Sequence, residues 1–76
     1  MKKLPSLKAR EVVGALKKFG FTEDRQKGGH LVMVNNSTKR RTVIPVHGGK
    51  DIKKFLLKKI IEEDLGVSVE EFLKML

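Results

Sequence analysis

The run Lys27-Gly28-Gly29-His30 combines residue types that could act on a phosphodiester. An imidazole ordinarily exchanges its proton near neutral pH, so it can work as a general acid or base. The glycines leave bare backbone that a ligand can approach closely, and the lysine adds positive charge. This combination suits proton removal from a ribose 2′-hydroxyl that attacks the neighbouring phosphate. We therefore predict an acid/base role on RNA for His30; the alternative is a surface histidine at a strand start.

A second histidine, His47, follows Pro45-Val46 and precedes two glycines. It could be a second acid/base group or a phosphate ligand, although a hydrogen-bonding loop histidine is the simpler interpretation. Two histidines without a third ligand at an obvious spacing make a poor metal site, because catalytic zinc usually takes three protein ligands. The chain has no Cys, which excludes a disulfide framework or thiolate site. We expect a reaction without metal or small-molecule cofactor.

Positive charge is concentrated in the first two thirds of the chain. Residues 1–50 hold twelve Lys and Arg against three Asp and Glu, whereas residues 51–76 hold five against six. This imbalance favours polyanions through counterion release, although solubility alone would also explain it. The candidate RNA contacts are Lys27, Gly28, Gly29, Arg40, Arg41, His47, Lys50, Lys53 and Lys54.

Two groups of these cations have an expected place in the fold. Arg40 and Arg41 begin a strand, so they point to opposite faces and at least one should line an uncovered sheet face. Lys50, Lys53 and Lys54 lie near the start of a helix, where the backbone dipole favours phosphate. For these lysines, a solvated helix face is the alternative.

Hydrophobic periodicity predicts an α+β domain spanning residues 1–76. A helix is expected from an N-cap at Ser6 to Gly20, followed by strands over 21–27, 30–34 and 40–46. A lysine-rich helix should then end at Gly66, and Ser68 with Glu71 should form a capping box that opens a last short helix. The order α-β-β-β-α-α implies a three-stranded antiparallel meander with helices on one face and the other face uncovered.

The few aromatic residues give little sign of base-specific recognition. Stacking on aromatic rings is the usual means of binding single strands, but all four phenylalanines fit core or helix-junction positions: Phe19, Phe21, Phe55 and Phe72. Recognition should then rest on shape, phosphates and 2′-hydroxyls. Neither a signal peptide nor a membrane span is evident, so a cytoplasmic protein is expected.

Taken together, several motifs resemble the HicA toxin family over nearly the whole chain. They are Gly20-Phe21, Lys27-Gly28-Gly29-His30, Thr42-Val43-Ile44-Pro45-Val46-His47 and the lysine-rich helix. The resemblance implies a fold similar to double-stranded RNA-binding domains. It also implies cleavage of mRNA by the histidine of a Gly-Ser-His motif, a role that falls on His30. Gly29 stands where the family usually has serine, and Phe55-Leu56 where members often have Gly-Thr.

The resemblance further implies a partner, an acidic HicB antitoxin that covers the histidine. From the residues alone, two other functions stay open. One is a non-catalytic RNA-binding module that uses the same basic face, and the other is a protein-interaction domain whose exposed sheet pairs with an acidic partner.

Overall fold

The computed structural model describes residues 4–46 and 50–76 of the chain. Their elements follow the expected order: α1 (Ala9–Lys18), β1 (Thr22–Lys27), β2 (His30–Asn35), β3 (Arg40–Pro45), α2 (Lys54–Lys59), the π-helical segment η1 (Ile60–Leu65) and α3 (Val69–Leu73). The three strands form an antiparallel sheet in the order β1-β2-β3. The predicted meander and α+β class are therefore confirmed.

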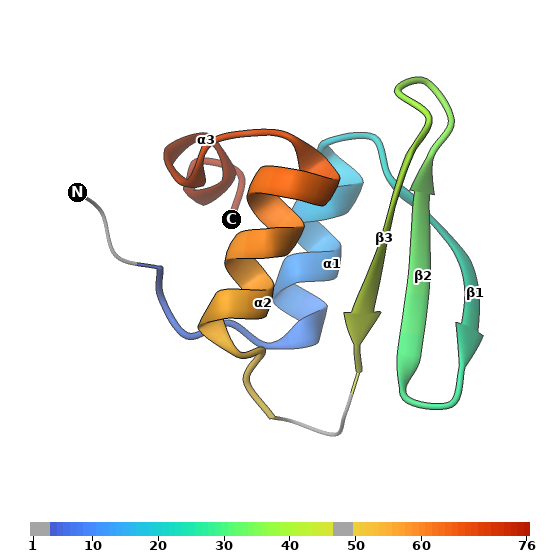
Figure 1. Cartoon of the computed structure of the whole chain (residues 1–76), viewed down its shortest axis with the longest axis horizontal. Coiled ribbons are helices and arrows are strands. Elements are labelled where there is room, and N and C mark those ends of the chain that lie inside the picture. The colour runs from blue at the N-terminus through green and yellow to red at the C-terminus, as the bar shows by residue number, and fades with distance from the viewer. Residues whose placement is uncertain (1–3, 47–49) are drawn as a thin grey trace.

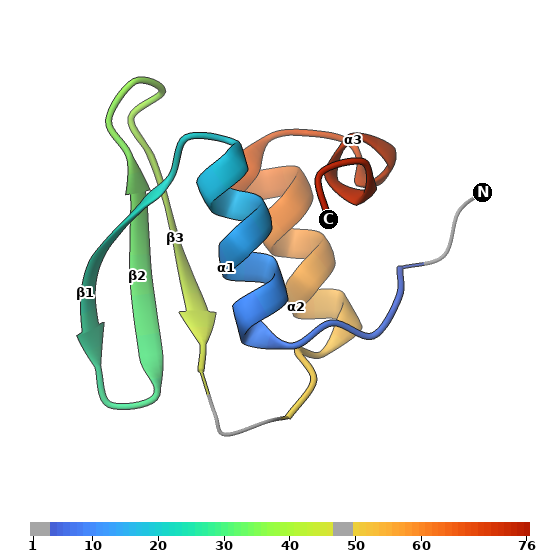
Figure 2. The same cartoon turned by 180° about the vertical axis from the view of Figure 1, so that it is seen from behind.

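The helices lie together on one side of the sheet, and β3 is the strand nearest to them (Figures 1 and 2). Alternate residues of β2 and β3 point into this layer, where Leu31, Met33 and Ile44 are buried. From the helices come Leu16, Leu57 and Phe72, each 0% exposed. Burial of each such side chain contributes roughly 1.5–3 kcal/mol, so this layer holds the fold together. Every residue of β1 is exposed, because β1 lies farthest from the helices.

Helix α1 begins later than the sequence predicts. The N-cap is Lys8, whose backbone N–H donates to Glu11 Oε1 at 3.0 Å, so the expected N-cap at Ser6 is wrong. The physical reason is a long-range contact: the Leu7 carbonyl accepts a hydrogen bond from the Ile52 N–H at 2.8 Å. This bond holds the chain before Lys8 extended beside the start of the second helical region, and a helix cannot form there.

The expected helix ends are correct. Gly20 follows α1 with a φ of 95°, and Gly66 closes η1 with a φ of 78°, both in the left-handed region that glycine tolerates. At α3, Ser68 Oγ accepts from the Glu71 N–H at 3.1 Å, as the predicted cap requires. The second half of the lysine-rich helix is wound as a π-helix, which the sequence pattern does not reveal.

A buried amide joins α1 to the sheet. Asn35, 5% exposed, donates from Nδ2 to the carbonyl of Phe19 at 3.1 Å. Its Oδ1 accepts from the N–H groups of Ser37 at 3.0 Å and Thr38 at 3.3 Å. The same side chain thereby satisfies a carbonyl at the end of α1 and fixes the turn between β2 and β3.

Candidate functional site

His30 is the first residue of β2 and is exposed. In the sheet it pairs with Lys27 across the diglycine turn and with Pro45 on β3. The turn depends on Gly28, which has a φ of 59°. The predicted placement of the histidine at a strand start, beside the glycines and the lysine, is therefore confirmed.

The side of the sheet turned away from the helices, called here the outer face, carries a set of cations around His30. The strand register arranges the residues of the outer face in three rows across the sheet: Lys27-His30-Pro45, Arg25-Val32-Val43 and Thr22-Val34-Arg41. Side chains directly opposite one another on antiparallel strands lie about 5 Å apart at their Cβ atoms. Lys27 is thus the closest cation to His30 on this face.

A β-bulge decides which side chains of β1 reach the outer face. The register shifts between Glu23 and Arg25, so that Asp24 is the extra residue. Regular alternation from Thr22 would turn Asp24 and Gln26 outward, whereas the shift turns Arg25 and Lys27 outward instead. The bulge therefore gives this edge of the outer face a positive charge rather than a negative one.

The two neighbouring arginines of β3 lie on opposite faces. Arg41 is on the outer face, whereas Arg40 is on the helix side, where its Nη1 donates to the carbonyls of Glu63 at 3.2 Å and Asp64 at 3.5 Å. These carbonyls belong to the last turn of η1, so Arg40 caps that segment. The expectation that at least one of the pair lines the uncovered face is met by Arg41.

A groove runs along β3 toward α2 and contains His30. We call it the His30 groove; it is lined by His30, Arg41, Thr42, Val43, Pro45, Leu56, Lys59 and Asp64. Its lining is apolar at Val43, Pro45 and Leu56. At the helix side, Lys59 Nζ lies 3.9 Å from an oxygen of Asp64, whose other carboxylate oxygen accepts from Thr42 Oγ1 at 2.9 Å. The groove thus joins an imidazole to two long cationic side chains from different elements.

The structure brings some predicted residues to His30 and places others apart. Lys27, Gly28 and Gly29 adjoin it in the turn. Lys50 and Lys53 line a neighbouring hollow, which shares Pro45 and Leu56 with the His30 groove. Lys54 is exposed at the first position of α2 but lines neither of these two hollows. His47 lies outside the described residues.

The sequence pattern did not predict the positions of three residues in this region. Arg25 was missed because a bulge leaves no mark in the alternation pattern, and Lys59 because its approach to β3 depends on helix packing. Phe55 is 75% exposed, so its expected place in the core or at a helix junction is wrong. The position of Phe55 two residues before the buried Leu57 was a usable signal, since that spacing puts the ring on the opposite side of the helix.

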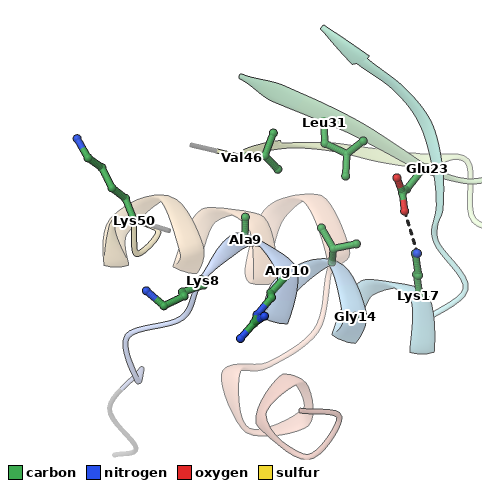
Figure 3. A pocket seen from close by; sticks show the side chains of 10 residues that line it. Lys8, Ala9, Arg10, Gly14, Lys17, Glu23, Leu31, Val46 and Lys50 are labelled. Carbon is green, nitrogen blue, oxygen red and sulfur yellow. Dashed lines mark ion pairs between the residues drawn. The ribbon is translucent and has the colours of Figure 1, made fainter. Parts of the chain in front are cut away.

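A second groove lies on the helix side of the sheet, between α1 and the strands (Figure 3). Leu31 and Val46 point into it from the sheet, toward Ala9 on α1. Its rim is basic, but part of that charge is neutralised: Lys17 Nζ lies 2.8 Å from Glu23, and Lys8 Nζ lies 3.5 Å from Asp51. Of the predicted RNA contacts that lie in the described part of the chain, this groove includes Lys50 alone.

The described residues contain neither a metal cluster nor a membrane-spanning helix. No group of three or more His, Cys, Asp or Glu residues suited to a metal ion occurs in residues 4–46 and 50–76. In the same residues, no helix is both long and apolar enough to cross a bilayer.

Comparison with known proteins identifies the family. No curated protein matched the chain. A family model described as the HicA toxin of bacterial toxin-antitoxin systems matches residues 9–67, from the start of α1 to just beyond η1. This match covers well over half of the chain and includes every residue of the His30 groove. The chain therefore belongs to the HicA toxin family.

Proposed function

We propose that this toxin is a metal-independent endoribonuclease that cleaves mRNA, with His30 as its general acid/base. The observation that carries the proposal is the position of His30, an exposed imidazole on a cation-rich sheet face and in a groove with Arg41 and Lys59. An imidazole with a cation directly opposite it and further cations along the same face and groove suits a substrate with a phosphate at the reacting centre.

In the proposed reaction, His30 removes the proton of a ribose 2′-hydroxyl. The 2′-oxygen then forms a bond to the adjacent phosphorus, and the bond from phosphorus to the 5′-oxygen of the next nucleotide breaks. Water donates a proton to complete the 5′-hydroxyl, the hydroxide that remains takes the proton back from His30, and the other product ends in a 2′,3′-cyclic phosphate. DNA lacks the attacking hydroxyl and is not a substrate.

The cations have separate parts in this proposal. Lys27, directly opposite His30, stabilises the negative charge that grows on the reacting phosphate. Arg41 lies two rows from His30, because it pairs with Val34, which is four residues after His30 on β2. This separation corresponds to roughly 13 Å along the strand. At that separation Arg41 holds a different phosphate of the same RNA strand.

The test is cleavage of a single-stranded RNA in excess EDTA, with analysis of the product ends. His30→Ala is expected to lower the cleavage rate by about 10²- to 10⁴-fold, the usual contribution of a general acid or base. An RNA with 2′-deoxynucleotides at the cleaved positions should stay intact. Gln26→Ala is the matched control, because Gln26 is exposed on β1 next to Lys27 but pairs with the inward-facing Leu31.

Other outcomes would assign another function. Scission of the 2′-deoxy substrate, or an unchanged rate in His30→Ala, would overturn the mechanism. RNA binding without any scission would indicate a non-catalytic RNA-binding module. Lack of RNA binding at every salt concentration would indicate a protein-interaction domain.

We also infer that a HicB-like acidic antitoxin covers the outer face and blocks His30. Arg25, Lys27 and Arg41 supply positive charge on that face to complement such a partner. An acidic HicB-like protein encoded in a neighbouring reading frame should co-purify with this chain and suppress cleavage. Substitution of Arg25 and Arg41 by Ala should weaken the complex, and an unchanged affinity would contradict this mode of binding.

A further inference from the structure

The most exposed large hydrophobic side chain among the described residues is Phe55, at 75%. It is the second residue of α2, and Leu57 from the same helix is fully buried. Since successive helical positions differ by about 100°, residues two apart point in nearly opposite directions. Phe55 therefore faces away from the core, and a phenyl ring left in water suggests a binding partner.

The surroundings of Phe55 have a specific chemistry. It lines a hollow with Pro45, Lys50, Asp51, Ile52, Lys53 and Leu56. The carboxylate of Asp51 lies 3.5 Å from Lys8 Nζ, so its charge is offset from outside the hollow. Two lysines remain beside an exposed ring and the apolar side chains of Pro45, Ile52 and Leu56, which is the combination that binds a nucleobase and its phosphate.

This hollow continues directly from the His30 groove. Pro45 and Leu56 line both, and Pro45 is also the strand partner of His30. An RNA strand whose phosphate lies at His30 therefore passes over Pro45 and Leu56 before reaching Phe55. The adjoining position favours RNA as the occupant over an unrelated protein segment, because the same strand would fill both hollows.

We propose that Phe55 is a stacking platform for a nucleobase close to the cleaved bond, with Lys50 and Lys53 as contacts to its phosphate. The proposal rests on the proposed function of His30 and adds an RNA subsite to it. Every base has a flat face, so stacking on Phe55 strengthens binding with little preference for one base.

A fluorescence titration tests the subsite directly. The chain has neither Trp nor Tyr, so Phe55→Trp provides a single fluorophore at the proposed contact. In a His30→Ala background, which prevents cleavage, hexamers of uridine and of adenosine should quench its emission. An emission that does not change while the hexamers bind would overturn the proposal.

Affinity and cleavage measurements give a second test. Phe55→Ala should weaken hexamer binding by about 5- to 150-fold, the range that stacking of one base supports. An abasic nucleotide at the stacked position should cost the wild type a similar factor and cost Phe55→Ala little more. Leu76→Ala is the control, because Leu76 is 47% exposed and lines neither the hollow nor the His30 groove.

The outcomes separate this subsite from the proposed function. If Phe55→Ala binds and cleaves RNA like the wild type, the subsite is wrong while the role of His30 stands. If the variant loses only its affinity for a HicB-like partner, the ring belongs to a protein interface and the subsite is also wrong. If stacking occurs but cleavage does not depend on His30, the subsite stands and the catalytic proposal fails.

Discussion

Lys27 and His30 are direct cross-strand partners, separated in the chain by Gly28 and Gly29 alone. A two-residue turn gives the pair little freedom to separate, so the ammonium group and the imidazole are held on one face by the backbone itself. Pro45 on β3 is the third residue of the same row, so His30 lies between Lys27 on one side and Pro45 on the other. The proposed reacting phosphate would lie over this row, with a cation on one side and the His30 groove on the other.

The adjacent arginines of β3 provide a matched pair of variants. Arg41→Ala should weaken RNA binding and lower the slope of log affinity against log salt by about one unit, because one phosphate contact is lost. Arg40→Ala removes the same charge but should instead lower the thermal midpoint, since it exposes the carbonyls of Glu63 and Asp64. Equal effects of both variants on RNA binding would show that net charge alone matters.

The glycines of the turn should respond differently to serine. Gly29 is not among the positive-φ residues, whereas Gly28 has a φ of 59°. Gly29→Ser restores the serine of the family motif, and a hydroxyl contact to phosphate should raise the cleavage rate by about tenfold. Gly28→Ser should destabilise the fold by roughly 1–2 kcal/mol through left-handed strain. A rate in Gly29→Ser at or below that of the wild type would contradict a phosphate contact by this hydroxyl.

The buried amide of Asn35 should matter for stability. Asn35→Ala removes its hydrogen bonds to the Phe19 carbonyl and to the turn N–H groups, which should reduce the free energy of unfolding by about 1–3 kcal/mol. Urea denaturation measures this change. Asn36→Ala is the control, because Asn36 is exposed in the same turn, and a loss as large in this variant would argue against a specific role for Asn35.

Gly66 and Arg40 should be coupled energetically. A Cβ atom at Gly66 would lie 2.8 Å from the Arg40 guanidinium carbon, and the φ of 78° adds strain for any side chain. Gly66→Ala should therefore lower stability, and less so in an Arg40→Ala background where the collision is absent. A double-mutant cycle measures the difference. Additive losses would show that the guanidinium simply moves aside.

The sequence predicted those parts of the fold that depend on local pattern. Helical periodicity, the diglycine turn and the glycines at the helix ends were sufficient for the order of elements and for the place of His30. Contacts between distant segments decided the rest. The hydrogen bond between Leu7 and Ile52 delays α1, and the packing of α2 leaves Phe55 exposed. The contact between Leu7 and Ile52 has no signal within a short window of sequence, whereas the two-residue spacing between Phe55 and Leu57 does point to the exposure of Phe55.

The bulge at Asp24 also has a consequence for how this protein can change through mutation. An in-frame deletion of that single codon would remove the bulge but leave Arg25 opposite Val32 and Lys27 opposite His30, so both cations would stay on the outer face. Because β1 contributes no buried residue, the hydrophobic core would hardly be affected. One codon can therefore be lost from this strand edge without loss of its positive charge on the outer face, which makes position 24 a tolerant site for evolution and for protein engineers.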